Sequence, residues 1–185
     1  MAGDGAVTSA PLRVVERQRW VVEALAVGPS DRLLEIGCGA GTATALVAER
    51  LREGRILAID RAASAVRQAR ERNATQIRTG KVEVRHLDIT AAEDAAAAEL
   101  PDHSFDTIFA VNVSLFWLAT PPGLLGQIGR LLAPGGTLRV FAERPTHAAV
   151  AAIAAQVSGA LRTHAFTPVT ATVTGSRATV TGQVG

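Results

Sequence analysis

Short apolar runs alternate with segments of helical periodicity along most of this chain. RLLEIG (32–37), RILAID (55–60) and SFDTIFAVNVSLFW (104–117) are such runs, and TATALVAERL (42–51) is one of the helical segments between them. A strand followed by a helix, repeated about five times, builds a parallel sheet with helices on both faces. The sequence therefore predicts an α/β fold, and the run at 104–117 suits the central strand because such a strand is buried on both faces.

The remaining segments extend this pattern toward both ends of the chain. Amphipathic spacing predicts helices at 12–27, 62–71, 91–100, 121–133 and 147–161, with Pro134, Gly135 and Gly136 stopping the fourth of these. KVEVRHLDI (81–89) predicts a strand nearer a sheet edge, TLRVFAE (137–143) predicts another strand, and FTPVTATVTG (166–175) with SRATVTGQV (176–184) predicts an antiparallel hairpin. We expect a single domain over 1–185, with a helical leader at 1–27 and a core at 30–184.

Composition excludes several classes of protein. The single cysteine cannot form an internal disulfide, and the four histidines never fall at metal-ligand spacing, so no metal is expected. The formal net charge of +2 gives nucleic acid no special support as a partner. No apolar stretch approaches the roughly 18 residues of a membrane span, and the first residues lack an export signal. We therefore expect a soluble, cytoplasmic protein.

The most informative segment is LLEIGCGAGT (33–42), where the first strand turns into a helix. Glycines permit a tight reversal there, and a ligand lying against bare backbone can reach N–H groups and the helix N-terminus. The dinucleotide-binding fingerprint G-x-G-x-x-G would require glycine at the position of Thr42, whereas this chain has E-x-G-x-G-x-G. The spacing favours a nucleotide-type cofactor other than NAD, although a purely structural turn remains open.

Four segments in the expected order resemble the class I S-adenosylmethionine-dependent methyltransferase family. LLEIGCGAGT is similar to the first motif of that family, RILAID ends on Asp60, HLDI contains Asp88, and FDTIFAVNVSLFW with LLAPGGTLRVF resembles the fourth and fifth strand segments. The resemblance covers roughly residues 30–184. It implies a three-layer Rossmann-like fold with a mostly parallel seven-stranded sheet and an antiparallel C-terminal hairpin. It also implies methyl transfer from S-adenosylmethionine, which leaves S-adenosylhomocysteine.

The resemblance assigns cofactor-binding roles residue by residue. Asp60 would accept hydrogen bonds from the two ribose hydroxyls, and Asp88 would accept one from the adenine amine. The backbone carbonyl of Asn112 would receive the methionine amino group. The methionine end would lie over the glycine turn, which contributes Glu35, Gly37, Cys38, Gly39 and Gly41. Arg61 and Ile89 would flank the adenosine.

Structural interpretations of four of these residues remain open beside the functional ones. Asp60 and Asp88 could each cap a following helix. Glu35 could be a buried structural acceptor. Cys38 has no accompanying Pro-Cys or Cys/His arrangement, so it is assigned no chemistry beyond a small residue in a tight turn.

The sequence constrains the methyl acceptor mainly by exclusion. Asn112-Val113-Ser114-Leu115 is not the Asp/Asn-Pro-Pro-Tyr/Phe turn of enzymes that methylate exocyclic amines, and no Pro-Cys nucleophile is present. Phe116, Trp117 and Trp20 could line an acceptor pocket or belong to the core. A general base is needed only if the acceptor must lose a proton, and the candidates are His103, His147 and His164. A small-molecule acceptor is favoured. With little room for an inserted lid, specificity could depend on the leader helix and on the second subunit of a homodimer.

Three alternative functions remain open. An NAD-type oxidoreductase is disfavoured by Thr42 at the third-glycine position. A noncatalytic S-adenosylmethionine-binding or accessory protein would have the same motifs. An RNA or protein methyltransferase would need a basic face around the pocket, for which the only indications are Arg17, Arg19, Arg61 and Arg67.

Overall fold

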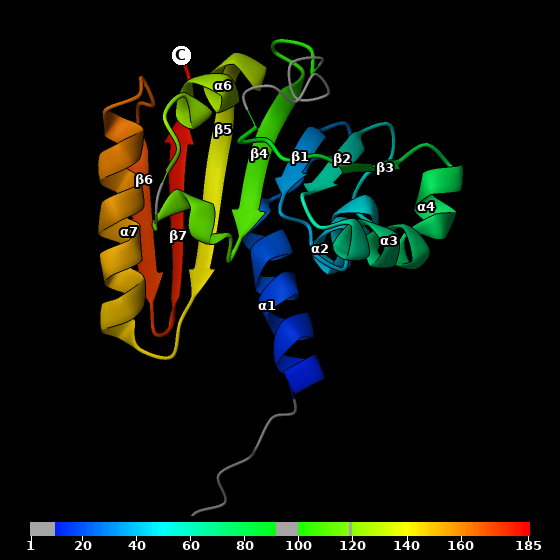
Figure 1. Ribbon diagram of the computed structural model, residues 1–185, viewed down its shortest axis with the longest axis horizontal. Helices are drawn as coiled ribbons and strands as arrows, with labels where there is room; N and C mark the ends of the chain where they lie inside the picture. The colour runs from blue at the N-terminus through cyan, green and yellow to red at the C-terminus, as the bar shows by residue number, and fades with distance from the viewer. Residues whose placement is uncertain (1–9, 92–99, 119) are drawn as a thin grey trace, which may run out of the picture.

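The computed structural model describes residues 10–91, 100–118 and 120–185. The helices are α1 (Ala10–Leu25), α2 (Thr42–Ala48), α3 (Ala63–Arg72), α4 (Ala74–Arg78), the 3-10 helix η1 (Ser114–Phe116), α6 (Leu124–Leu131) and α7 (His147–Arg162). The strands are β1 (Arg32–Ile36), β2 (Arg55–Asp60), β3 (Val82–His86), β4 (Phe105–Val111), β5 (Leu132–Glu143), β6 (Val169–Thr174) and β7 (Arg177–Gln183). Figure 1 shows their arrangement. The helix predicted at 91–100 lies largely outside the described residues.

The seven strands form one sheet in the order β3-β2-β1-β4-β5-β7-β6. The pairs among β1 to β5 are parallel, whereas β7 runs antiparallel to β5 and to β6. This topology confirms the predicted mostly parallel, seven-stranded sheet with its antiparallel hairpin. It also confirms β4 as the central strand and β3 as an edge strand.

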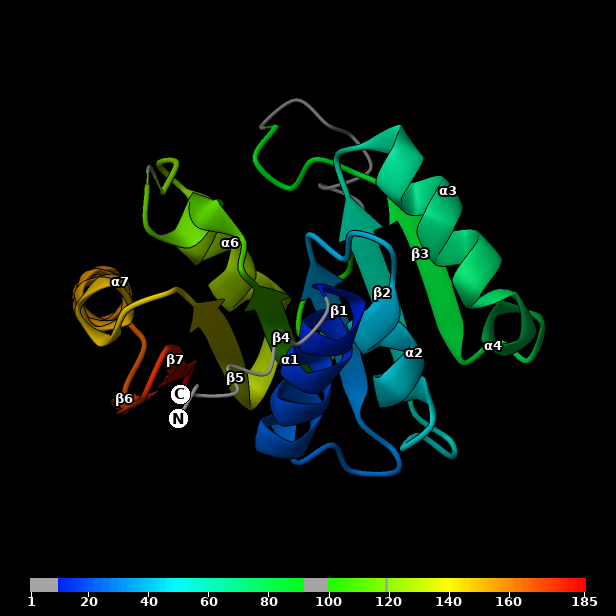
Figure 2. The same ribbon diagram turned by 90° about the horizontal axis from the view of Figure 1, so that it is seen from below.

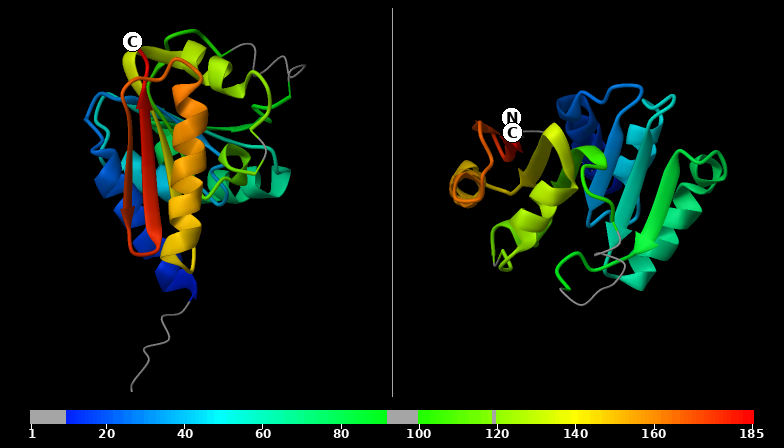
Figure 3. Two further views of the ribbon diagram at one scale, coloured as in Figure 1. Left: turned by 90° about the vertical axis from the view of Figure 1, so that its left-hand side faces the viewer. Right: turned by 90° about the horizontal axis from the view of Figure 1, so that it is seen from above.

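Two apolar clusters fill the space between the sheet and its two helical layers. One cluster joins the sheet to α6 and α7 and includes Ile108 and Val140. The other joins the opposite face to α1, α2 and α3 and includes Phe109 and Phe141. Alternating residues of β4 and β5 thus serve both clusters, as expected for strands buried on both faces. Figure 2 shows α6 and α7 on the side of the sheet away from α1 and α2, and Figure 3 shows α7 beside the terminal hairpin.

The start of β5 differs from the sequence prediction. The helix before it ends at Leu131, ahead of the proline and glycines expected to stop it, and strand pairing begins at Leu132 with Phe105. The next pair joins Thr107 to Thr137, so residues 133–136 bulge out of the ladder. Gly135 has a φ of 76°, a left-handed conformation that favours glycine. The Pro-Gly-Gly segment therefore forms a turn inside the strand.

The leading helix α1 packs against α2 and β5 and confirms the predicted helix at 12–27 within small differences at its ends. The Nη1 atom of Arg139 donates to the carbonyl of Ala24 at 2.7 Å, and Nε of Arg17 meets a carboxylate oxygen of Glu143 at 2.7 Å. In Figure 1 the arrowheads of β4 and β5 point toward the end of the sheet at which α1 lies. Among the described residues, no helix is long and apolar enough to cross a bilayer.

Candidate functional site

The glycine turn after β1 is fastened to the end of β2 by backbone hydrogen bonds. The N–H groups of Gly37 and Cys38 both donate to the carbonyl of Ile59, at 2.9 and 3.0 Å. The N–H of Gly39 donates to Oδ2 of Asp60 at 2.9 Å. The turn and the carboxyl end of β2 therefore form one rigid unit.

The three glycines of this turn have positive φ but face different surroundings. At Gly37, an added Cβ would lie 2.6 Å from Cγ2 of Val113. At Gly41, it would lie 2.9 Å from Cβ of Ala69, so this glycine allows α2 and α3 to approach closely. At Gly39, an added Cβ would meet nothing within 4 Å. Only Gly39 leaves open space beside the backbone.

Asp60 lies at the end of β2 with both carboxylate oxygens engaged. Oδ2 accepts from Gly39, and Oδ1 accepts from the N–H of Ala62 at 2.9 Å. Ala62 is the N-cap of α3 and that helix has no side-chain cap hydrogen bond, so Asp60 orders the entry to α3 without capping it. Because a carboxylate oxygen accepts more than one hydrogen bond, each oxygen retains capacity for a further donor.

Asp88 lies just beyond the end of the neighbouring strand, β3. Its Oδ1 accepts from the N–H of Thr90 at 3.0 Å and from the hydroxyl of Thr90 at 2.7 Å. These hydrogen bonds to Thr90 lower the pKa of Asp88 below its ordinary value, so the group is ionised at neutral pH. Oδ2 has no partner within the described parts of the chain, and a donor could therefore reach it.

The residues at these strand ends line one cavity of about 340 Å³, which we call the strand-end cavity. It lies at the carboxyl ends of β1 to β4, the place where ligands bind in open α/β sheets. Six of the ten predicted cofactor-binding residues line it, namely Gly37, Asp60, Arg61, Asp88, Ile89 and Asn112. The sequence interpretation did not assign Ile36, Ile59, Leu87, Thr90, Val113, Ser114 and Leu115, which also line it. All seven flank an assigned residue closely in the sequence, and that adjacency was the available signal.

The other four predicted residues lie outside this lining, and two of them are titratable. Glu35 is 2% exposed, and its Oε2 accepts from the hydroxyl of Thr44 at 2.5 Å. Burial raises the pKa of Glu35 to about 7. Burial also raises the pKa of the Cys38 thiol, which keeps it protonated and unreactive at neutral pH. A cofactor role for Glu35, Cys38, Gly39 and Gly41 stays a prediction.

Asn112 joins the ends of the two central strands. Its φ is +57°, its N–H donates to the carbonyl of Phe141 at 2.8 Å, and its Oδ1 accepts from the N–H of Glu143 at 2.8 Å. A second donor to the same oxygen is Nη1 of Arg144, at 3.0 Å. The side chain thus continues the β4–β5 ladder, which the sequence did not predict. The assignment of the Asn112 carbonyl to the methionine amine stays a prediction.

Of the aromatic residues considered for an acceptor pocket, two are buried in the core and the third, Trp20, is partly buried against it. Phe116 and Trp117 are buried among the residues between the sheet and α6, and neither lines the strand-end cavity. Trp20 packs edge-on against Phe141, with 5.4 Å between ring centroids. The structural interpretation of these three aromatics therefore describes them better than the pocket interpretation. Their neighbours Ser114 and Leu115 reach the cavity instead.

The histidines considered as general bases are exposed and bonded to backbone carbonyls elsewhere. His103 contacts the carbonyl of Leu132, His147 that of Gly175, and His164 that of Ala160. None of the three lines the strand-end cavity. Of the four arginines considered as a basic face, Arg61 lines the cavity and Arg17 is paired with Glu143 in an ion pair between α1 and β5.

A methyltransferase domain family matches residues 34–138, which is more than half of the chain. The chain belongs to the class I S-adenosylmethionine-dependent methyltransferase family. This membership confirms the resemblance predicted from the four motifs and disfavours the oxidoreductase alternative. S-adenosylmethionine is the cofactor of this methyltransferase family, and six of the ten residues predicted to bind it line the strand-end cavity.

Curated relatives of this methyltransferase chain carry a specific name. A trans-aconitate 2-methyltransferase from Paracidovorax citrulli is 31% identical over 148 residues, covering 76% of this chain and 52% of that protein. Another, from Methylobacterium radiotolerans, is 35% identical over 148 residues, covering 76% of this chain and 51% of that protein. The chain spans about half the length of these curated relatives.

Solved structures share the fold of this methyltransferase. A predicted O-methyltransferase from Agrobacterium tumefaciens has a TM-score of 0.68 at 23% identity, covering 91% of this chain and 81% of that one. An S-adenosylmethionine-dependent methyltransferase from Aquifex aeolicus has a TM-score of 0.67 at 18% identity, covering 95% and 94%. At these identities the likeness shows the fold alone, and it confirms the Rossmann-like architecture.

Proposed function

We propose that this chain binds S-adenosylmethionine in the strand-end cavity and transfers the methyl group to a small carboxylic acid. One observation carries the cofactor part of the proposal. Two carboxylates, Asp60 and Asp88, follow neighbouring parallel strands and line a single cavity that begins at the glycine turn. This places two acidic acceptors along one wall, as a nucleoside with a ribose diol and an exocyclic amine requires.

The residues present fit the adenosine part of the cofactor. Each oxygen of Asp60 retains capacity to accept one ribose hydroxyl in addition to its backbone donor. Oδ2 of Asp88, which has no partner among the described residues, suits the adenine amine, and Ile89 with Leu87 offers apolar surface to the ring. Charge-assisted hydrogen bonds of this kind contribute roughly 1.5–3 kcal/mol each.

The residues at the ends of β1 and β4 fit the methionine part. Gly37 brings bare backbone to the cavity, and Asn112 stands opposite it at the end of β4 with its side chain already committed to β5. When bound, S-adenosylmethionine supplies an electrophilic methyl group on a sulfonium, which leaves as a neutral thioether when a nucleophile takes the methyl. The chain's own task is to hold the nucleophile in line with the methyl group and the sulfur, and to exclude water.

Two observations support a carboxylic acid as the acceptor. The curated relatives are named for methyl transfer to trans-aconitate, a tricarboxylic acid. A carboxylate is ionised at neutral pH and needs no general base before it attacks. The described residues that line the strand-end cavity fit such an acceptor because they include no histidine.

Calorimetric titration of the 185-residue chain with S-adenosylmethionine, S-adenosylhomocysteine and NAD tests the cofactor part. We expect saturable binding of the first two ligands only. Asp60→Asn should weaken it roughly 10- to 100-fold, because one or two charge-assisted hydrogen bonds are lost. Asp102→Asn is the matched control, since this exposed carboxylate pairs with Arg130 away from the cavity.

Turnover is measured with trans-aconitate as the acceptor, by the appearance of S-adenosylhomocysteine together with the methyl ester. Binding of NAD without S-adenosylmethionine would contradict the cofactor assignment. Cofactor binding without any methyl ester would instead favour the noncatalytic binding protein.

A further inference from the structure

Positive charge exceeds negative charge where β4 and β5 end. The carboxylate of Glu143 accepts from Nε of Arg17 at 2.7 Å and from Nε of Arg177 at 3.2 Å. Arg144, the next residue, has no carboxylate partner in the part of the chain that the structure describes. Two of the three guanidinium groups at this end of the sheet therefore bind the one carboxylate, and the third, that of Arg144, binds none. An anion would complete the balance, and Arg144 is the group left to bind it.

Arg144 is held in place by neutral partners. Its Nη1 donates to Oδ1 of Asn112 at 3.0 Å and to the carbonyl of Glu143 at 2.7 Å. Its guanidinium carbon lies 4.9 Å from the centroid of the Trp117 ring, a cation–π contact. The backbone N–H of Arg144 donates to the carbonyl of Ser176 at 3.0 Å, so the backbone is fixed as well. These contacts orient the guanidinium without neutralising it.

The remaining donors of Arg144 are available to a ligand. Nε and Nη2 have no acceptor among the described residues, and the side chain is only partly exposed. A guanidinium presents its donors in a planar fork that matches the two oxygens of a carboxylate, and partial burial strengthens such a pair. Two parallel N–H donors on one edge are the arrangement that a carboxylate, a planar anion, fits.

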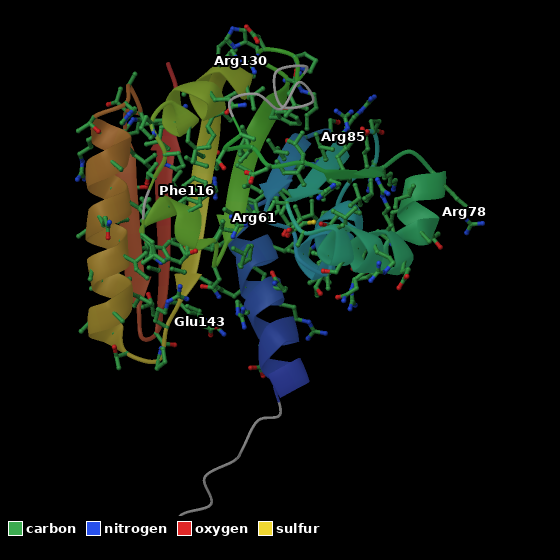
Figure 4. All side chains as sticks on the ribbon, viewed as in Figure 1. Arg61, Arg78, Arg85, Phe116, Arg130 and Glu143 are labelled. Carbon is green, nitrogen blue, oxygen red and sulfur yellow. The ribbon has the colours of Figure 1, made fainter. Side chains whose placement is uncertain are left out.

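Arg144 lies beside the strand-end cavity and does not line it. It bonds to Asn112, which lines the cavity at the end of β4, and it stacks on Trp117, which follows the lining residues Ser114 and Leu115. Figure 4 shows Glu143 near the end of β5, whereas Arg61 follows β2, which lies on the other side of β4 in the sheet. Arg144 is therefore on the β5 side of Asn112, away from the two carboxylates proposed to hold adenosine.

We propose that Arg144 binds a carboxylate of the methyl acceptor and makes the site selective for acidic molecules. Asn112 and Trp117 act as positioning residues, because they fix the guanidinium and do not themselves bind the acceptor. This inference rests on the proposed function and adds to it the residue that recognises the substrate.

The test measures binding of trans-aconitate to the chain saturated with S-adenosylhomocysteine, so it needs no turnover. We expect Arg144→Met to weaken this binding roughly 10- to 100-fold, the effect of losing a charge-assisted pair. Arg144→Lys should retain part of the affinity, because an ammonium keeps the charge and loses the fork. Arg130→Met is the matched control; Figure 4 shows Arg130 at the opposite end of the sheet.

The trimethyl ester of trans-aconitate separates charge from shape. The wild-type chain should bind the acid in preference to the ester, and Arg144→Met should lose that preference while its affinity for S-adenosylhomocysteine changes less than twofold. Equal binding of the acid by wild type and Arg144→Met, or no binding of the acid by wild type, would overturn the inference. If S-adenosylhomocysteine still binds in either case, the cofactor part of the proposed function stands. If wild type does not bind S-adenosylhomocysteine, the proposed function itself is refuted.

Discussion

Replacing Glu35 with glutamine should stabilise the protein at neutral and alkaline pH. Burial raises the pKa of Glu35 from an ordinary 4.5 to about 7, mainly because the ionised form is desolvated. The folded protein therefore holds this proton more tightly than the unfolded chain does. Between about pH 4.5 and 7 this group's contribution to stability falls as the pH rises, and above that window the whole penalty applies. The difference in pKa corresponds to about 3 kcal/mol.

Glutamine is the right substitution because it keeps the shape of the side chain and its hydrogen-bond acceptor. Its carbonyl oxygen can accept from the hydroxyl of Thr44 as Oε2 of Glu35 does, and it carries no charge at any pH. The free energy of unfolding is measured by urea denaturation at several pH values from about 4.5 to 8, for wild type and for Glu35→Gln. The difference in free energy of unfolding between the variant and wild type should grow by about 3 kcal/mol as the pH rises through that range.

Thr44→Val provides a matched control in the opposite direction. The hydrogen bonds from Thr44 lower the pKa of Glu35, so losing the hydroxyl should raise that pKa further and extend the loss of stability to higher pH. Parallel pH profiles for wild type and Glu35→Gln would refute the argument. They would mean that Glu35 titrates as it does in water, and that the carboxylate is better solvated than its burial indicates.

The glycine turn gives two further predictions. Gly41→Ala should lower the free energy of unfolding, measured by urea denaturation, by about 3 kcal/mol, because an alanine there has an unfavourable left-handed φ and clashes with Ala69. Gly39→Ala should lower it by only about 1 kcal/mol, because only the φ is unfavourable there. Equal losses would contradict the packing role of Gly41. Gly37→Ala should displace Val113 and weaken S-adenosylhomocysteine binding in calorimetry by roughly tenfold or more, at a stability cost of about 2–3 kcal/mol; unchanged affinity would place the ligand away from Gly37.

Sequence patterns predicted the sheet and the position of two carboxylates at its edge because both depend on local features. A parallel strand buried on both faces is a continuous apolar run, and the run around Ile108 and Phe109 accordingly lies at the centre of the sheet. Asp60 and Asp88 directly follow their strands, and adjacent parallel strands end at the same edge of a sheet. Local spacing therefore sufficed to bring these two carboxylates together.

Features that depend on pairing between distant segments were not predictable in this way. The bulge at 133–136 follows from the register of β5 against Phe105, whereas the Pro-Gly-Gly segment by itself indicates only a helix stop. Trp117 has the same sequence signature whether it lines a pocket or fills a core. Its burial is decided by α6 and by the guanidinium of Arg144, which come later in the chain.

The two sides of the site differ in how they are built, and this difference makes them separable by mutation. The proposed cofactor side is formed by residues that follow β1, β2 and β3, and it is held together by the hydrogen bonds from Gly37 to Ile59 and from Gly39 to Asp60. The proposed acceptor side is Arg144, whose guanidinium is oriented by Oδ1 of Asn112, 32 positions earlier in the sequence. Sites without shared partners have nearly additive effects. Substitutions at Asp60 should therefore alter cofactor affinity and those at Arg144 acceptor affinity, and strong coupling between them would mean that both ligands share one wall of the cavity.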